Sequence, residues 1–340
     1  MAEPAPLQRC IFCLQKRSGT EEHVFPRAIG GRLITNRVCE PCNSMLGSRV
    51  DAALCNSFIV RSRRARLGLA GNSGVVPASH EMLLGVARLA EDREQRVQVT
   101  FSTATQKLNI KALYHASDVV MQDGSKARQI FLDESDRDQI PKIIKKERER
   151  HGVPPLSEEQ LAAEVRRFTE SVVTIDNPKV LMSRTYDFSF VRHAMIKIAY
   201  ELAFLWLGES YLDDPEAAEL RAAIRKPDPA STNGLAAFVG EAENCGAFSL
   251  WSADTTSHLA FAFAGNEGIA IAVRVFDAHA AFVWVTKDAA RYLTGQNAGE
   301  KMRFLAIDPV SGKMTDTPII DEMRRMAAAT IARRRASRSG

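Results

Sequence analysis

Six cysteines occur in the chain, and four of them form two C-x-x-C pairs near the N-terminus. The two-residue spacing lets both thiolates of a pair face one tetrahedral Zn²⁺, and two pairs complete a structural site with no open coordination position. In a reducing compartment, cysteines in this pattern are metal ligands more often than disulfides. The sequence therefore predicts one structural Zn²⁺ and leaves Cys55 and Cys245 as core residues; the predicted zinc ligands are Cys10, Cys13, Cys39 and Cys42.

A second set of polar residues lies between these pairs and directly after them. Glu22 and His23 are adjacent, Asn36 precedes the second pair, and Asn43 follows its last cysteine. An imidazole titrates near neutral pH and can act as a general base. A carboxylate and an amide oxygen are ligands that suit Mg²⁺ or Mn²⁺. A base and a divalent cation together are what hydrolysis of a phosphodiester bond requires.

The order and spacing of these residues match a known pattern. The segments CIFC, EHVFPRAIGG, TNRVCEPCN and NSMLGSRVD resemble the HNH endonucleases, in particular those whose ββα-metal finger is braced by a four-cysteine zinc. The resemblance covers residues 8–56 and implies nothing about residues 75–340. It implies an acidic residue and a histidine on a first strand, a Gly-Gly turn, and a helix that opens after the second cysteine pair.

The resemblance also implies a role for each of these residues. His23 would be the general base, while Glu22 and Asn43 would hold a catalytic Mg²⁺ or Mn²⁺. Asn36 would be the middle residue that fixes the loop and orients the histidine. Asp51, on the same expected helix as Asn43, is interpreted as a helix-surface charge or a loop brace rather than a metal ligand.

The implied activity is metal-dependent cleavage of DNA, expected to be double-stranded. By analogy, an HNH protein with a large accessory region is a restriction or phage-defence nuclease. Two alternatives stay open: a non-catalytic zinc module that binds nucleic acid as a regulator, and a defence effector gated by a small-molecule or protein trigger. Glu22 and His23 favour the nuclease, because a binding module needs neither. A homo-oligomer also stays open.

The charge distribution is consistent with a polyanionic partner. The net charge is +4, but residues 1–72 hold 11 Lys and Arg against five Asp and Glu, so this segment carries +6 and the remainder −2. A basic segment of this kind either meets a polyanion or is a solvated face. The phosphate contacts that we predict beside the site are the arginines of the segment VRSRRARLG, namely Arg61, Arg63, Arg64 and Arg66.

The fold class that we predict is α+β. An HNH finger over residues 1–72 is followed by an accessory α+β domain over 73–340, whose role we do not assign and which could divide near residue 185. In that domain we expect a hairpin about Asp123–Gly124, charged helices over 136–152 and 157–172, and antiparallel strands from residue 257 onward, the first two joined at Gly265–Gly268.

The segment 187–212 predicts a long buried helix. His193, Lys197 and Glu201 recur on it at intervals of four, and a packed helix with one polar edge is favoured over a pocket. No apolar run reaches the roughly 18 residues that a membrane span needs, so we expect a cytoplasmic protein without a membrane partner.

Overall fold

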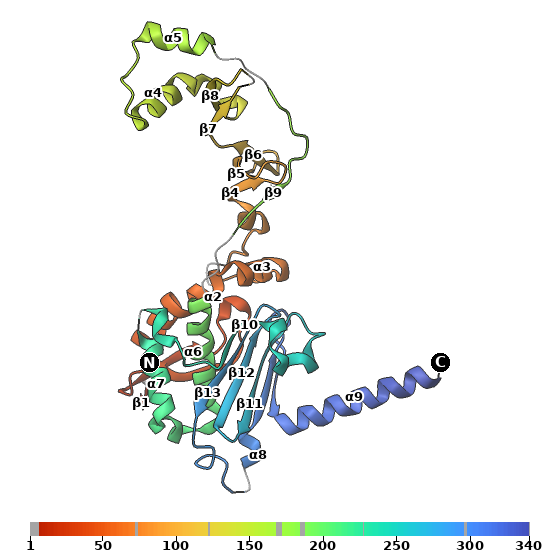
Figure 1. The fold of residues 1–340 in the computed structure, drawn as a ribbon. Coiled ribbons are helices and arrows are strands. Elements are labelled where there is room, and N and C mark those ends of the chain that lie inside the picture. The colour runs from red at the N-terminus through yellow and green to blue at the C-terminus, as the bar shows by residue number, and fades with distance from the viewer. Residues whose placement is uncertain are drawn as a thin grey trace. The chain divides into compact units, whose positions relative to one another are not determined.

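The computed structural model describes residues 7–71, 74–121, 123–167, 172–183, 188–226, 228–295 and 298–339. The chain forms two compact units, and Figure 1 shows their elements. The core unit combines Met1–Ala78 with Tyr186–Gly340, and the inserted unit is Ser79–Thr185. Both units mix helices and antiparallel sheets, which confirms the α+β class.

The N-terminal finger of the core unit has the expected ββα arrangement. Strands β1 (Leu7–Arg9), β2 (Lys16–His23) and β3 (Ile34–Cys39) form an antiparallel sheet in the order β1-β2-β3. Helix α1 (Glu40–Met45) follows Cys39 at once and has a proline in its first turn, where a missing N–H costs nothing. A π-helical turn (Leu46–Asp51), α2 (Ala52–Asn56) and α3 (Phe58–Leu67) complete the finger.

The reversal between β2 and β3 depends on its two glycines. Gly30 has φ +87°, a conformation that side-chain-bearing residues rarely adopt, and a Cβ there would lie 2.5 Å from Cβ of Pro309. A Cβ on Gly31 would lie 1.7 Å from the main-chain oxygen of Phe25. The Gly-Gly pair therefore permits both the tight turn and its contact with the C-terminal part of the core unit.

The C-terminal part of the core unit is built on a six-stranded antiparallel sheet in the order β10-β13-β12-β11-β14-β15. Strands β11 and β12 pair up to Gly265 and Gly268, which confirms the predicted hairpin. The bounds of these strands are β10 Phe238–Glu241, β11 His258–Gly265, β12 Gly268–Val275, β13 His279–Thr286, β14 Arg303–Ile307 and β15 Met314–Pro318. The helices around the sheet are α6 (Phe188–Leu207), α7 (Pro215–Arg225), α8 (Ala298–Lys301) and α9 (Ile319–Ser339).

Helix α6 lies between the finger and this sheet (Figure 1). One side packs against β12 and β13, and the other packs against α2 and the π-helical turn. Leu54 of α2, Ile198 of α6 and Val273 of β12 accordingly belong to one hydrophobic core. A helix that is covered on both sides must be apolar nearly all round, and α6 is. The finger thus shares its core with residues 186–340, and the domain boundary at residue 72 stays a prediction.

Among its described residues, the inserted unit holds two small sheets and two helices. One sheet has the order β6-β5-β4-β9, and the hairpin of β7 and β8 closes about Asp123–Gly124 as predicted. Its elements are β4 Gly85–Leu89, β5 Arg96–Ser102, β6 Lys107–Ala112, β7 His115–Val120, β8 Lys126–Phe131, α4 Ile140–Arg150, α5 Glu158–Arg167 and β9 Val180–Leu181.

Short 3₁₀ turns connect many of these elements. They lie at Arg27–Ile29, Ser79–Leu83, Glu134–Gln139, Glu209–Asp213, Pro229–Thr232, Ala242–Asn244 and Gly246–Trp251. Across the described ranges, no helix combines the length and the apolar character that a membrane crossing requires.

A buried histidine ties the finger to the C-terminal sheet. His258 of β11 is 0% exposed; its Nε2 lies 2.8 Å from the carbonyl oxygen of Ile29, and its Nδ1 accepts a hydrogen bond from the backbone N–H of Phe276 at 3.3 Å. Because Nδ1 accepts, Nε2 carries the proton of a neutral ring and donates to Ile29. Burial lowers the pKa of His258 to about 4.

This histidine predicts a loss of stability in mild acid. The histidine has a pKa of about 6.5 in the unfolded chain, whereas in the folded chain His258 takes up the proton only near its pKa of about 4. The contribution of His258 to the free energy of unfolding is therefore largest near pH 7 and falls as the pH falls. Denaturant titrations should show about 1 kcal/mol lost from this group between pH 7 and pH 5.5. His258→Gln should be less stable at pH 7 and lack that part of the pH dependence. An identical pH slope in both proteins would contradict the assignment.

Candidate functional site

The four cysteines of the two pairs converge at one end of the finger. Their Sγ atoms all lie within 4.8 Å of one another, and three of the four side chains are buried. The backbone N–H of Cys39 donates to Sγ of Cys10 at 3.4 Å, and Leu14, with φ +60°, closes the first turn by donating its N–H to the carbonyl of Cys10 at 2.9 Å. Four thiols at this separation fit one structural Zn²⁺.

The thiols of the cluster differ in their pKa shifts: burial raises the pKa of Cys39 and Cys42, whereas that of Cys10 is lowered. Burial alone would raise the pKa of this thiol, but backbone hydrogen bonds involving Cys13, Cys39 and Phe12 outweigh burial and lower the pKa to about 7. The segment of the first cysteine pair also packs on α6, because the ring of Phe12 lies 5.2 Å from that of Tyr200. The cysteine cluster therefore lies against the core that the finger shares with α6.

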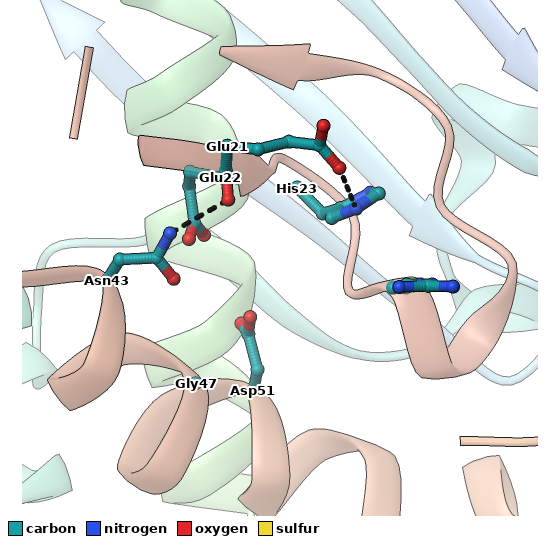
Figure 2. Close-up of a pocket in the computed structure, with 7 residues that line it drawn as sticks. Glu21, Glu22, His23, Asn43, Gly47 and Asp51 are labelled. Atoms are coloured by element: carbon teal, nitrogen blue, oxygen red, sulfur yellow. Dashed lines mark hydrogen bonds and ion pairs between the residues drawn. The ribbon is translucent and has the colours of Figure 1, made fainter. Parts of the chain in front are cut away.

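A cavity of about 290 Å³ opens beside the end of β2 (Figure 2). Three consecutive residues at the end of β2 contribute to its lining: Glu21 is exposed, His23 is half-buried, and Glu22 is only 3% exposed. From the helical side, three residues spaced by four contribute. The lining residues are Glu21, Glu22, His23, Arg27, Asn43, Gly47 and Asp51.

His23 is held by its neighbour on the same strand face. Its Nε2 lies 3.2 Å from Oε1 of Glu21, as the dashed line in Figure 2 shows. Its other ring nitrogen, Nδ1, is buried and has no hydrogen-bond partner among the described residues. With the proton of a neutral ring on Nε2, facing the carboxylate, Nδ1 is the nitrogen left to accept a proton. Glu21 was not selected from the sequence.

Asn43 is fixed so that its amide oxygen stays available. Its Nδ2 donates to Oγ1 of Thr20 at 3.0 Å and to the main-chain oxygen of Glu21 at 2.8 Å. These bonds use the nitrogen of the amide, and the residue lines the same cavity as Glu22. A carboxylate and an amide oxygen on one cavity are a donor set suited to Mg²⁺ or Mn²⁺.

A buried ammonium lies behind Glu22. Nζ of Lys197, from α6, lies 2.5 Å from Oε1 of Glu22, 3.4 Å from Oδ1 of Asp51 and 3.3 Å from Oε2 of Glu201. Burial raises the pKa of Asp51 to about 6 although Lys197 opposes the shift. For Lys197 burial would lower the pKa, but the three carboxylates together raise it, so the ammonium stays charged.

Two interpretations of the sequence are changed by this cluster. Asp51, for which the sequence predicts a helix-surface charge or a loop brace, lines the cavity with a side chain that is 15% exposed. Lys197, which the sequence predicts on the polar edge of a packed helix, is 0% exposed and reaches the finger. The i,i+4 spacing of Lys197 and Glu201 is equally common on solvated helices, so the spacing alone could not show this contact.

Other predicted site residues lie elsewhere. Asn36 is exposed on β3 rather than on a turn, and it is not among the residues that line the cavity. Within the arginine segment, Arg64 is buried and donates to the carbonyl of Cys55 at 3.2 Å. Arg63 forms a two-bond ion pair with Asp277, at 2.6 and 2.8 Å. Arg66 is exposed at the end of α3.

Comparison with known proteins agrees with this geometry. A family model described as HNH endonuclease matches residues 10–59, the segment that contains the cysteine cluster and all the residues that line the cavity. No curated protein and no solved structure matches the chain.

The cysteine cluster predicts one zinc per chain and a stability that depends on it. Cys39→Ser should lose the metal and, because the finger shares its core with α6, should lower hydrogen-exchange protection in α6 as well as in β2 and β3. Elemental analysis and hydrogen exchange measure both effects. Cys55→Ser, which changes a buried cysteine outside the cluster, should keep its zinc. Undenatured protein without zinc would contradict the site.

Proposed function

Starting from the HNH endonuclease domain at residues 10–59, we propose that the protein is a metal-dependent endonuclease that hydrolyses phosphodiester bonds of DNA. One observation carries the proposal. Glu22, His23 and Asn43, which come from the end of β2 and from α1, line a single cavity. A binding module would not need a buried carboxylate, a histidine with an unpaired nitrogen and a free amide oxygen to share one cavity.

In the proposed mechanism His23 activates the attacking water. The carboxylate of Glu21, 3.2 Å from Nε2, favours the proton of a neutral ring on that nitrogen, which would leave Nδ1 unprotonated. A buried nitrogen without a partner is uncommon, and a bound water would supply the missing hydrogen bond. Nδ1 then takes the proton as the water oxygen attacks phosphorus and the P–O bond to the leaving oxygen breaks.

Glu22 and Asn43 would hold the divalent cation. When bound, Mg²⁺ or Mn²⁺ supplies charge stabilisation at the scissile phosphate and the leaving oxygen. Two groups of the protein would fix the position of the cation. They are the carboxylate of Glu22, on the buried face of β2, and the amide oxygen of Asn43, whose amide nitrogen donates to Thr20 and Glu21. Asp51 lines the same cavity and adds negative charge near it.

Double-stranded DNA is the substrate that we favour, because the finger carries the net positive charge of the chain. Arg27 lines the cavity and is exposed, so it is a candidate contact to the scissile phosphate, while Arg66 and Arg61 are candidates for flanking phosphates. A role in restriction or phage defence, with or without a trigger, is part of the proposal, and expression in cells challenged with phage tests it.

The central prediction concerns His23. His23→Ala removes the base but no ligand of either metal, so the variant should keep its zinc and its affinity for DNA and lose about 10²- to 10⁴-fold in cleavage rate. Plasmid nicking with Mg²⁺ or Mn²⁺ measures the loss, and His151→Ala, outside the cavity, is the control. Unchanged cleavage at equal zinc content would refute the mechanism. Cleavage of RNA but not DNA would keep the mechanism and change the substrate.

The metal ligands should behave differently from the base. Glu22→Gln and Asn43→Ala weaken cation binding, so part of the lost activity should return at high Mn²⁺ concentration. His23→Ala should show no such rescue, because its deficit is a missing proton acceptor. Rates measured over a Mn²⁺ series separate the two patterns, and identical rescue of all three variants would count against these roles.

The arginines of α3 should divide into two groups. Arg66→Gln should weaken DNA binding and flatten its dependence on salt by about one unit of slope, if Arg66 meets a phosphate. Arg64→Gln should lower the melting temperature, because Arg64 is buried and bonded to Cys55. Fluorescence anisotropy over a salt series and thermal melts measure these effects. If the salt dependence of DNA binding were unchanged in Arg66→Gln, Arg66 would belong to a solvated face that contacts no phosphate.

A further inference from the structure

Lys197 contacts two consecutive residues of the proposed nuclease site. Its Nζ donates to the main-chain oxygen of His23 at 2.8 Å and lies 2.5 Å from Oε1 of Glu22. A weaker contact reaches the main-chain oxygen of Val24 at 3.4 Å. One ammonium thus fixes the strand end that carries the proposed base and the carboxylate that we assign to the cation.

The charges around this ammonium do not balance. Three carboxyl groups (Glu22, Asp51 and Glu201) face one lysine, which would give a net charge of −2 if all four groups were ionised. Burial raises the pKa of Glu201 well above its usual range and that of Asp51 to about 6, so protonation offsets part of this excess. Oε1 of Glu22, Oδ1 of Asp51 and both oxygens of Glu201 are buried and form no hydrogen bond of good geometry to any described residue. Buried ion pairs contribute little to stability once desolvation is counted, and unbalanced ones cost free energy. A buried ion pair of this kind is therefore a weak source of stability, and the contacts of Lys197 with Glu22 and His23 need a further reason.

A role in positioning accounts for these contacts. Carboxylates that bind metals are usually held by a second group, which fixes their orientation. Lys197 holds Oε1 of Glu22 from the core side, while the residue lines the cavity on its other side. The same ammonium anchors the main chain of His23, which sets where its ring stands relative to Glu22.

We propose that Lys197 is a positioning residue of the nuclease site, so that helix α6 completes a site whose other members lie in residues 10–59. The inference rests on the proposed function for what the site does, but its claim about cation binding can be tested without it. Lys197 acts through Glu22 and the main chain of His23 and touches no substrate.

An opposite reading of the same contacts is that the ammonium fills the position of the divalent cation and blocks the site. The two interpretations predict opposite changes in cation affinity and cleavage rate when Lys197 is removed. Removal of a positioning lysine weakens cation binding and slows cleavage. Removal of a blocking lysine strengthens cation binding and speeds cleavage.

The experiment uses the full-length protein and a variant in which apolar side chains replace both members of one buried pair. Lys197→Met/Glu201→Met removes the ammonium together with the carboxyl group whose pKa burial raises well above its usual range, and a buried pair often tolerates replacement by apolar chains of similar size. The control is His193→Leu, which removes a different buried polar group from α6, one whose Nε2 lies 2.9 Å from the carbonyl of Ile224 on α7. Zinc content and melting temperature establish that each protein is folded.

Calorimetric titration with Mn²⁺, without DNA, is the first measurement. The double variant should bind Mn²⁺ about 10- to 100-fold more weakly than the wild type, and His193→Leu should bind it with unchanged affinity. In a Glu22→Gln background the same double change should add little, because Lys197 acts through Glu22. Cleavage rates at saturating Mn²⁺ form the second measurement and should fall for the double variant.

Equal Mn²⁺ affinity in the folded double variant and the wild type would overturn the inference. Tighter binding or faster cleavage would overturn it in favour of the blocking lysine. A wild type that binds Mn²⁺ through Glu22 but cleaves no nucleic acid would refute the proposed function, while the affinity difference would still decide the role of Lys197. A wild type that binds no Mn²⁺ would overturn both.

Discussion

The burial of one lysine ammonium constrains the architecture of the core unit. Lys197 is 0% exposed and sits among three carboxylates, because α6 is covered by the sheet on one side and by the finger on the other. A charge in that position must be compensated by the groups around it. Glu22 and Asp51 supply that compensation from the finger, so the contacts that dock the finger on α6 also arrange the cavity. Stability and the geometry of the site are therefore coupled.

This coupling explains why the finger is not a separate compact unit. A finger of about 60 residues buries little apolar surface by itself, and zinc commonly makes up the difference. Here two further supports exist: Leu54 and other apolar residues of the finger join the core around α6, and His258 of the sheet donates to Ile29. The cysteine cluster joins residues 10–13 to residues 39–42, while α6 packs against α2 and the π-helical turn, and His258 of the sheet contacts Ile29.

The sequence predicted the parts of the site that are local. The spacing of the cysteine pairs, the adjacent Glu22 and His23 and the position of Asn43 are encoded within about 35 residues, and strand alternation then places the two side chains of β2 on opposite faces. The antiparallel strands and the buried helix were also readable, because their periodicity is local. The sequence did not predict the contacts between segments that are distant along the chain. Lys197 with Glu22, and Arg63 with Asp277, depend on the packing of α6 and the β12–β13 turn against the finger.

The residues that line the cavity and the residues of the inserted unit come from different segments of the chain. All residues that line the cavity come from residues 21–51, and the described residues in ionic contact with the buried part of that lining come from α6, after residue 185. The inserted unit, Ser79–Thr185, lies between these two contributions in sequence. The finger and α6 share one hydrophobic core although residues 79–185 separate them in the sequence, so the contacts that position Glu22 and Asp51 form between segments that are distant along the chain.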